Sequence, residues 1–133
     1  MSEKPPLSSL REEVFAYARR VYRTEPEYLW QRYPDYAVLR RPDDRKWYAL
    51  IGGVPRDKLG LEGSERVDVV NVKTGDEMLS DFLAGQKGYA PAYHMHKKNW
   101  VSVLLDGSVP FAEITALLDQ SYQAAAAGRG RHS

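Results

Sequence analysis

The stretch of residues 88–110 constrains the fold of this chain more than any other part of the sequence. It consists of two apolar segments separated by a short basic turn, which is the pattern of a β-hairpin. The turn carries two histidines and two lysines shortly before Trp100, and the second segment continues as Val-Ser-Val-Leu. Strands joined by a tight turn must be antiparallel, so this stretch predicts an antiparallel sheet.

Two further regions predict strands of the same sheet. Residues 36–40 and 47–54 are short apolar segments separated by residues 41–46, whose Pro-Asp-Asp sequence favours a turn. Together they predict another hairpin, which is the first of the two along the chain. Residues 66–72 alternate valine with polar residues, which predicts a strand with one solvated face. The intervening residues 56–64 contain two glycines and are expected to form a loop.

Helical patterns occupy both ends of the chain and one place between the hairpins. Ser9 and Glu12 have the spacing of a capping box, and the helix that follows is expected to end before Pro26. Residues 76–83 show apolar side chains at helical spacing over a short length. An amphipathic pattern over residues 111–122 predicts a closing helix, with a proline at its start.

These elements predict an α+β fold of the two-layer sandwich type, in which the N- and C-terminal helices cover one face of an antiparallel sheet. The chain has 133 residues, of which 43% are hydrophobic and 28% charged, as is typical of a soluble globular domain. We expect one domain over residues 1–133, with mobile tails at residues 1–6 and 128–133.

Composition also limits the cellular setting and the chemistry. No run approaches the roughly 20 apolar residues that cross a bilayer, and the first residues (MSEKPPLSSL) lack the apolar core of a signal peptide. The absence of cysteine excludes disulfides and thiolate chemistry. We therefore expect a cytoplasmic protein without membrane contact. The net charge of +1 says little about partners, because a nearly neutral total can hide a locally basic surface.

Three stretches of the sequence carry a resemblance to a known family. They are residues 26–30 (PEYLW) with 33–38 (YPDYAV), residues 45–50 (RKWYAL), and residues 88–95 (GYAPAYHM) followed by Trp100 and residues 105–110 (LDGSVP). On these residues the chain resembles the MmcQ/YjbR family, small bacterial proteins of CyaY-like α+β fold, over nearly its whole length. The resemblance implies a double-wing architecture and an inferred DNA-binding role. The second turn departs from the family pattern His-Met-Asn-Lys-x-His-Trp, because Asn99 stands where the family has histidine.

The two turns and the resemblance together predict a non-catalytic nucleic-acid-binding domain, with DNA as the expected partner. Cations in turns that lead into a tryptophan are placed to neutralise phosphates. Turns at opposite ends of the sheet could not grip one duplex, so this role requires both turns at the same end. The candidate contact residues are Arg40, Arg41, Arg45, Lys46, His94, His96, Lys97 and Lys98.

Plainer interpretations of the same residues remain open. Charged residues in turns are usually solvated, and Asp43 and Asp44 offset the cations of the first turn. The alternative function is a protein–protein interaction module, because tyrosine and tryptophan are favoured at interfaces as well as in half-buried cores. We expect a monomer or a weak homo-oligomer.

Metal binding and catalysis are less favoured. His94 and His96 would point to one side of a strand, but a third ligand is missing, and the arginine-rich first helix differs from the acidic helix of frataxin-type iron binders. Ser102 or Tyr93 could be combined with His94 and Asp106, yet no nucleophile or phosphate-loop motif accompanies them. We expect no enzymatic activity and no cofactor.

Overall fold

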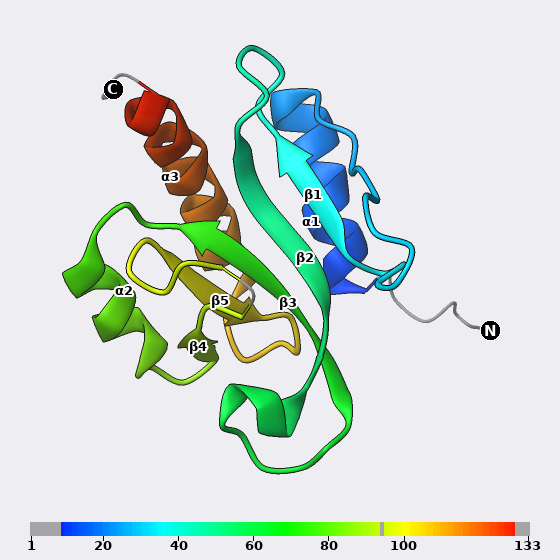
Figure 1. Cartoon of the computed structure of the whole chain (residues 1–133), viewed down its shortest axis with the longest axis vertical. Coiled ribbons are helices and arrows are strands. Elements are labelled where there is room, and N and C mark those ends of the chain that lie inside the picture. Colours follow the sequence, from blue (N-terminus) through cyan, green and yellow to red (C-terminus); the bar gives the residue numbers. More distant parts are fainter. Residues whose placement is uncertain (1–8, 94, 130–133) are drawn as a thin grey trace.

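The structure is a computed structural model that describes residues 9–93 and 95–129 (Figure 1). The expected tail at residues 1–6, and residues 130–133 of the other tail, lie outside the described residues. Gly128 and Arg129, which the sequence places in the C-terminal tail, are instead the last residues of the closing helix. The elements are α1 (Leu10–Tyr17), the π-helical turn η1 (Ala18–Tyr22), β1 (Ala37–Arg40), β2 (Trp47–Pro55), the 3-10 helix η2 (Arg56–Leu59), β3 (Arg66–Lys73), α2 (Glu77–Ala84), β4 (Tyr89–Pro91), β5 (Trp100–Leu104) and α3 (Phe111–Arg129).

The strands form one five-stranded antiparallel sheet in the order β1-β2-β3-β5-β4. Both predicted hairpins are present, because β1 pairs with β2 and β4 pairs with β5. The predicted loop at residues 56–64 differs in one respect, since it begins with the short helix η2. The α+β class predicted from the sequence is therefore confirmed.

Helices α1 and α3 cover the same face of the sheet, as predicted (Figure 1). Val14 and Phe15 of α1 and Ile114 and Leu118 of α3 belong to one buried cluster with the sheet. The strand residues of this cluster alternate along each strand and include Ala37, Leu39, Ala49, Ile51, Val70, Val72, Val101 and Val103. No described helix has the length and apolarity needed to cross a bilayer.

A β-bulge places one large residue of β2 in this core. Leu39 pairs with Ala49 and Arg40 pairs with Trp47, so Tyr48 is an extra residue without a partner on β1. Its ring lies among the helix-side residues and contacts Tyr122 of α3 edge-on at 4.9 Å between centroids. The bulge thus connects the first hairpin to the closing helix.

The ends of the first helix follow the local sequence signals. The Ser9 hydroxyl accepts a hydrogen bond from the Glu12 amide at 3.2 Å, which is the predicted cap. The helical region ends at Arg23, whose backbone is left-handed with φ of 57°, and this lies before Pro26 as predicted.

The face of the sheet opposite α1 and α3, here called the front face, is more buried than the sequence predicts. Asn71 of β3 and Ser102 of β5 lie on it and are buried, so the expectation that β3 has one solvated face is wrong along its middle. The Ser102 hydroxyl donates to the Asn71 side-chain oxygen at 2.5 Å, and the Tyr93 amide donates to the Ser102 hydroxyl at 3.2 Å. The chain after β4 therefore folds back over the front face, which separates these polar groups from water.

Candidate functional site

The two basic turns lie at the same end of the sheet. Strands β2 and β5 are both antiparallel to β3, so they run in the same direction, and the turn that precedes each of them is at the end toward which β3 points. In Figure 1 the turn of residues 41–46 lies at the top and the loop between β4 and β5 at the left, with the end of β3 between them. The two turns can therefore face one partner.

Two arginines at the first turn, one at the end of β1 and one in the turn itself, are already paired with one carboxylate. Glu27, which bridges to β1, accepts hydrogen bonds from Arg40 at 3.1 Å and from Arg45 at 2.6 Å. The hydrogen bond from Arg45, together with the charge of both arginines, holds the pKa of Glu27 below its ordinary value. The charge that Arg40 and Arg45 can offer to a ligand is reduced accordingly.

Arg41, a third candidate, points into the protein. Arg41 is only 7% exposed. Its guanidinium donates hydrogen bonds to the backbone oxygen of Tyr122 at 2.9 Å and to the carboxylate of Asp43 at 2.8 Å. It also pairs with the buried carboxylate of Asp44 at 3.3 Å. Arg41 therefore connects the first turn to α3 and is not placed to contact a phosphate.

Lys46 completes the first turn and differs from its arginines. It forms no ion pair with another described residue. It lies close enough to Lys73, the last residue of β3, to affect the charge there: burial, and then the charge of Lys46, lower the pKa of Lys73. The sequence analysis did not predict Lys73 as a contact residue. Because Lys73 is two positions after Asn71 on the same strand, it lies on the same face of the sheet, the front face.

The second turn presents its cations to solvent. His96, Lys97 and Lys98 are exposed, while His94 lies outside the described residues. The loop is attached to the end of β3 because the backbone oxygen of Asn99 accepts hydrogen bonds from the amides of Thr74 and Gly75, at 2.6 and 3.2 Å. We call Lys46, Lys73, His96, Lys97 and Lys98 together the basic end of the sheet, although Lys97 also lines a hollow with Lys58 and Gly60, which follow β2.

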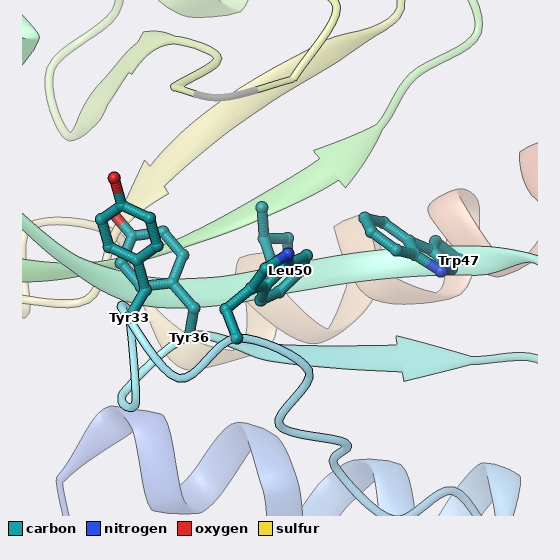
Figure 2. Close-up of a pocket in the computed structure, with 5 residues that line it drawn as sticks. Tyr33, Tyr36, Trp47 and Leu50 are labelled. Carbon is teal, nitrogen blue, oxygen red and sulfur yellow. The ribbon is translucent and has the colours of Figure 1, made fainter.

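An aromatic hollow, of about 270 Å³, opens on the front face beside the basic end. In Figure 2 the rings of Tyr33 and Tyr36 stand at one end of it and Trp47 at the other, with Leu50 between them. The Tyr33 and Tyr36 rings lie 5.4 Å apart at 58°, and Trp30 meets Trp47 edge-on at 5.8 Å. The sequence shows this density of aromatic residues, but their convergence depends on the loop between η1 and β1 folding over the first hairpin.

Tyr36 is fixed as a wall of the hollow by a close backbone approach. Its hydroxyl donates to the backbone oxygen of Gly53 at 3.3 Å, and burial raises its pKa to about 12. Its ring lies directly over Gly52, where an added Cβ atom would come within 2.8 Å of two ring carbons. Only glycine leaves room for the ring at this position.

We expect Gly52→Ala to lower the free energy of unfolding by about 1–3 kcal/mol, because the methyl group and the Tyr36 ring cannot occupy the same space. Urea denaturation measures the change. Gly85→Ala is the control, since a Cβ atom there would make only an ordinary contact of 3.7 Å. A loss no larger than that of the control would contradict the close packing of Tyr36.

The groups considered for catalysis and metal binding are engaged in other ways. Ser102 is buried and bonded to Asn71, and Asp106 accepts a hydrogen bond from Ser108 and pairs with Arg56 at 3.7 Å. Among the described residues, which leave out His94, no three histidine, aspartate or glutamate side chains are grouped as metal ligands would be.

Comparison with known proteins agrees with this architecture. The sequence profile of the YjbR family matches residues 19–124. The uncharacterized protein YyaQ of Bacillus subtilis is 41% identical over 112 residues, which are 84% of this chain and 94% of YyaQ. A crystal structure of a Pseudomonas syringae protein has a TM-score of 0.82 at 41% identity, covering 86% of this chain and 97% of that one.

A more distant likeness concerns the fold alone. The Deinococcus radiodurans protein DR2400 has a TM-score of 0.63 at 21% identity, covering 90% of this chain and 80% of its own. The family profile and YyaQ each span most of the sequence, including the two hairpins that carried the resemblance. On these matches the chain belongs to the YjbR family.

Proposed function

We propose that the protein binds nucleic acid, with DNA as the first candidate, through the basic end of its sheet and without catalysing a reaction. One observation carries the proposal: the two basic turns lie at the same end, with Lys73 between them. The turns act as two wings on either side of the end of β3. The protein acts in the cytoplasm, as a monomer or a weak homo-oligomer.

The electrostatics of the basic end support an anionic partner. Lys46 and Lys73 repel each other, and Lys73 is half-buried, so its charge is poorly solvated. A phosphate between the two lysines would relieve this repulsion. Binding to phosphates supplies most of the affinity of non-specific nucleic-acid association and makes it dependent on salt.

The set of expected phosphate-binding residues differs from the one predicted from the sequence. The neutralised Arg40 and Arg45 contribute less, the internal Arg41 is left out, and Lys73 is added. The lysines Lys46, Lys97 and Lys98 and the exposed His96 remain, and His94 stays a prediction outside the described residues.

The test is the salt dependence of binding to a fluorescently labelled DNA duplex, followed by anisotropy. We expect the triple variant Lys46→Gln, Lys97→Gln and Lys98→Gln to weaken binding at low salt and to reduce the slope of log K against log salt by about 0.9 for each phosphate that is no longer neutralised. Lys87→Gln is the control, because this exposed lysine precedes β4 at the other end of the sheet.

Two results would refute the proposal. One is the absence of binding by the wild-type protein, at low salt, to both this duplex and a single-stranded DNA of equal length. The other is a triple variant whose affinity and salt slope equal those of Lys87→Gln. Lys73 is omitted from the triple variant because it belongs to the central strand β3, where a change could affect folding as well as binding.

The protein-interaction alternative stays a prediction, and one surface favours it. Met78 and Phe82 lie four residues apart on α2 and are 82% and 63% exposed. They are outside the basic end, so Phe82→Ser is expected to leave DNA binding unchanged.

A further inference from the structure

The aromatic hollow continues directly from the basic end. Trp47, which closes one end of the hollow, follows Lys46 in the chain and begins β2. The guanidinium of Arg40, which is paired with Glu27, lies over the Trp47 ring at 6.0 Å from its centroid, so the cations at this border are Lys46 and the partly neutralised Arg40. A nucleic-acid strand whose phosphates bind the lysines of the basic end would therefore pass beside the aromatic rings that line the hollow.

The size and lining of the hollow restrict its occupant. It is lined by four aromatic side chains and one leucine, and its volume of about 270 Å³ is just below the range of drug-sized sites. Tyr33 is 47% exposed and Trp30 is half-buried, so their rings can be reached from solvent. Such a hollow suits one flat ring system better than an extended ligand.

We propose that the hollow takes an unpaired nucleobase whose strand is held by the lysines of the basic end. This inference rests on the proposed nucleic-acid binding and extends it to the base. The pairing of an aromatic surface with adjacent cations matches the two parts of a nucleotide, because bases stack on aromatic rings while phosphates bind lysine and arginine.

The arrangement favours single-stranded or locally unpaired nucleic acid over a blunt duplex. In a duplex the bases are stacked on one another, and only an unpaired base exposes its face to a protein ring. Every base has such a face, and the lining residues are mainly apolar, so we expect little preference among sequences.

The experiment compares three labelled probes of equal length: an oligothymidine single strand, an abasic single strand, and a blunt duplex. We expect the wild-type protein to bind oligothymidine roughly 5- to 150-fold more tightly than the abasic strand, which is the effect of stacking one base. Quenching of tryptophan fluorescence by oligothymidine, and not by the abasic strand, would report contact with Trp30 or Trp47.

Variants at Tyr33 locate the effect. Tyr33→Ala should lower the affinity for oligothymidine toward that of the abasic strand and leave the affinity for the abasic strand unchanged. Tyr33→Phe should keep the wild-type preference for oligothymidine, because the ring remains. The unchanged affinity of Tyr33→Ala for the abasic strand excludes misfolding as the cause of its weaker binding to oligothymidine. Tyr28→Ala is the matched control, since Tyr28 is 53% exposed on the same segment but does not line the hollow.

The outcomes separate this inference from the proposed function. Equal binding of oligothymidine and the abasic strand would overturn base stacking, and so would an unchanged preference of Tyr33→Ala for oligothymidine. In either case, salt-dependent binding of all three probes would still support the proposed nucleic-acid binding. Failure to bind any of the three probes at low salt would overturn both.

Discussion

Replacing Arg41 with alanine is expected to lower the free energy of unfolding by about 3–5 kcal/mol, the range found when one partner of a buried ion pair is removed. The side chains of Arg41 and Asp44 are 8% and 9% exposed, so the variant would leave the Asp44 carboxylate buried without its cation. It would also remove the hydrogen bond to the backbone oxygen of Tyr122 and the packing against its ring, whose centroid is 4.2 Å away.

Arg45→Ala is the matched control for this prediction. Its side chain is 59% exposed and pairs with Glu27 at the surface, where an ion pair contributes at most about 1 kcal/mol. Urea denaturation of both variants measures the difference. Equal losses of stability would contradict an internal role for Arg41. The prediction also bears on binding assays, because weaker DNA binding by Arg41→Ala would report unfolding rather than the removal of a phosphate-binding side chain.

The second large effect is expected at Tyr48, whose replacement by alanine should cost about 3–5 kcal/mol, as is usual when a buried aromatic side chain is deleted. Tyr48 is fully buried, and its ring packs edge-on against Tyr22 at 5.5 Å and Tyr122 at 4.9 Å. The alanine variant would leave a cavity where the first hairpin, η1 and α3 meet.

Tyr48→Phe tests whether the ring or the hydroxyl carries this effect. The hydroxyl is buried near the Thr24 side chain, whose own hydroxyl donates to the backbone oxygen of Arg40, so its removal should change the free energy of unfolding by less than about 1 kcal/mol. Thermal or urea unfolding distinguishes the two variants. A phenylalanine variant as unstable as the alanine variant would show that the hydroxyl, rather than ring packing, stabilises this junction.

Much of the fold follows from local sequence signals. The cap at Ser9, the turn at residues 41–46 and the alternation along β5 each depend on residues close together in the chain. The arrangement of helices on one face then follows, because antiparallel strands leave both helices one apolar surface to cover. The prediction for β3 failed where a distant segment mattered, since its solvated face depended on whether the chain after β4 folds over it.

The candidate site was predicted less well than the fold. Arg41 and Lys46 have the same charge and lie in the same turn, yet one is buried against α3 and the other forms no ion pair with a described residue. Lys73 and the aromatic residues of the hollow are far apart in the sequence and meet only through strand pairing and loop packing. No local pattern distinguishes such residues from ordinary surface or core positions.

The strands, the turns, the cap of α1 and the family of this protein can be inferred from its residues alone, because these depend on periodicity and on short-range steric and hydrogen-bonding preferences. The packing of the whole chain sets which cations of the first turn are neutralised by Glu27, Asp43 and Asp44, and it brings Lys46 close to Lys73. It also decided that the loop between η1 and β1 meets Trp47 to form the aromatic hollow. The physical reason is that charge neutralisation and concavity depend on distances of a few ångströms between residues from different elements, and those distances are set by the packing of the whole sheet.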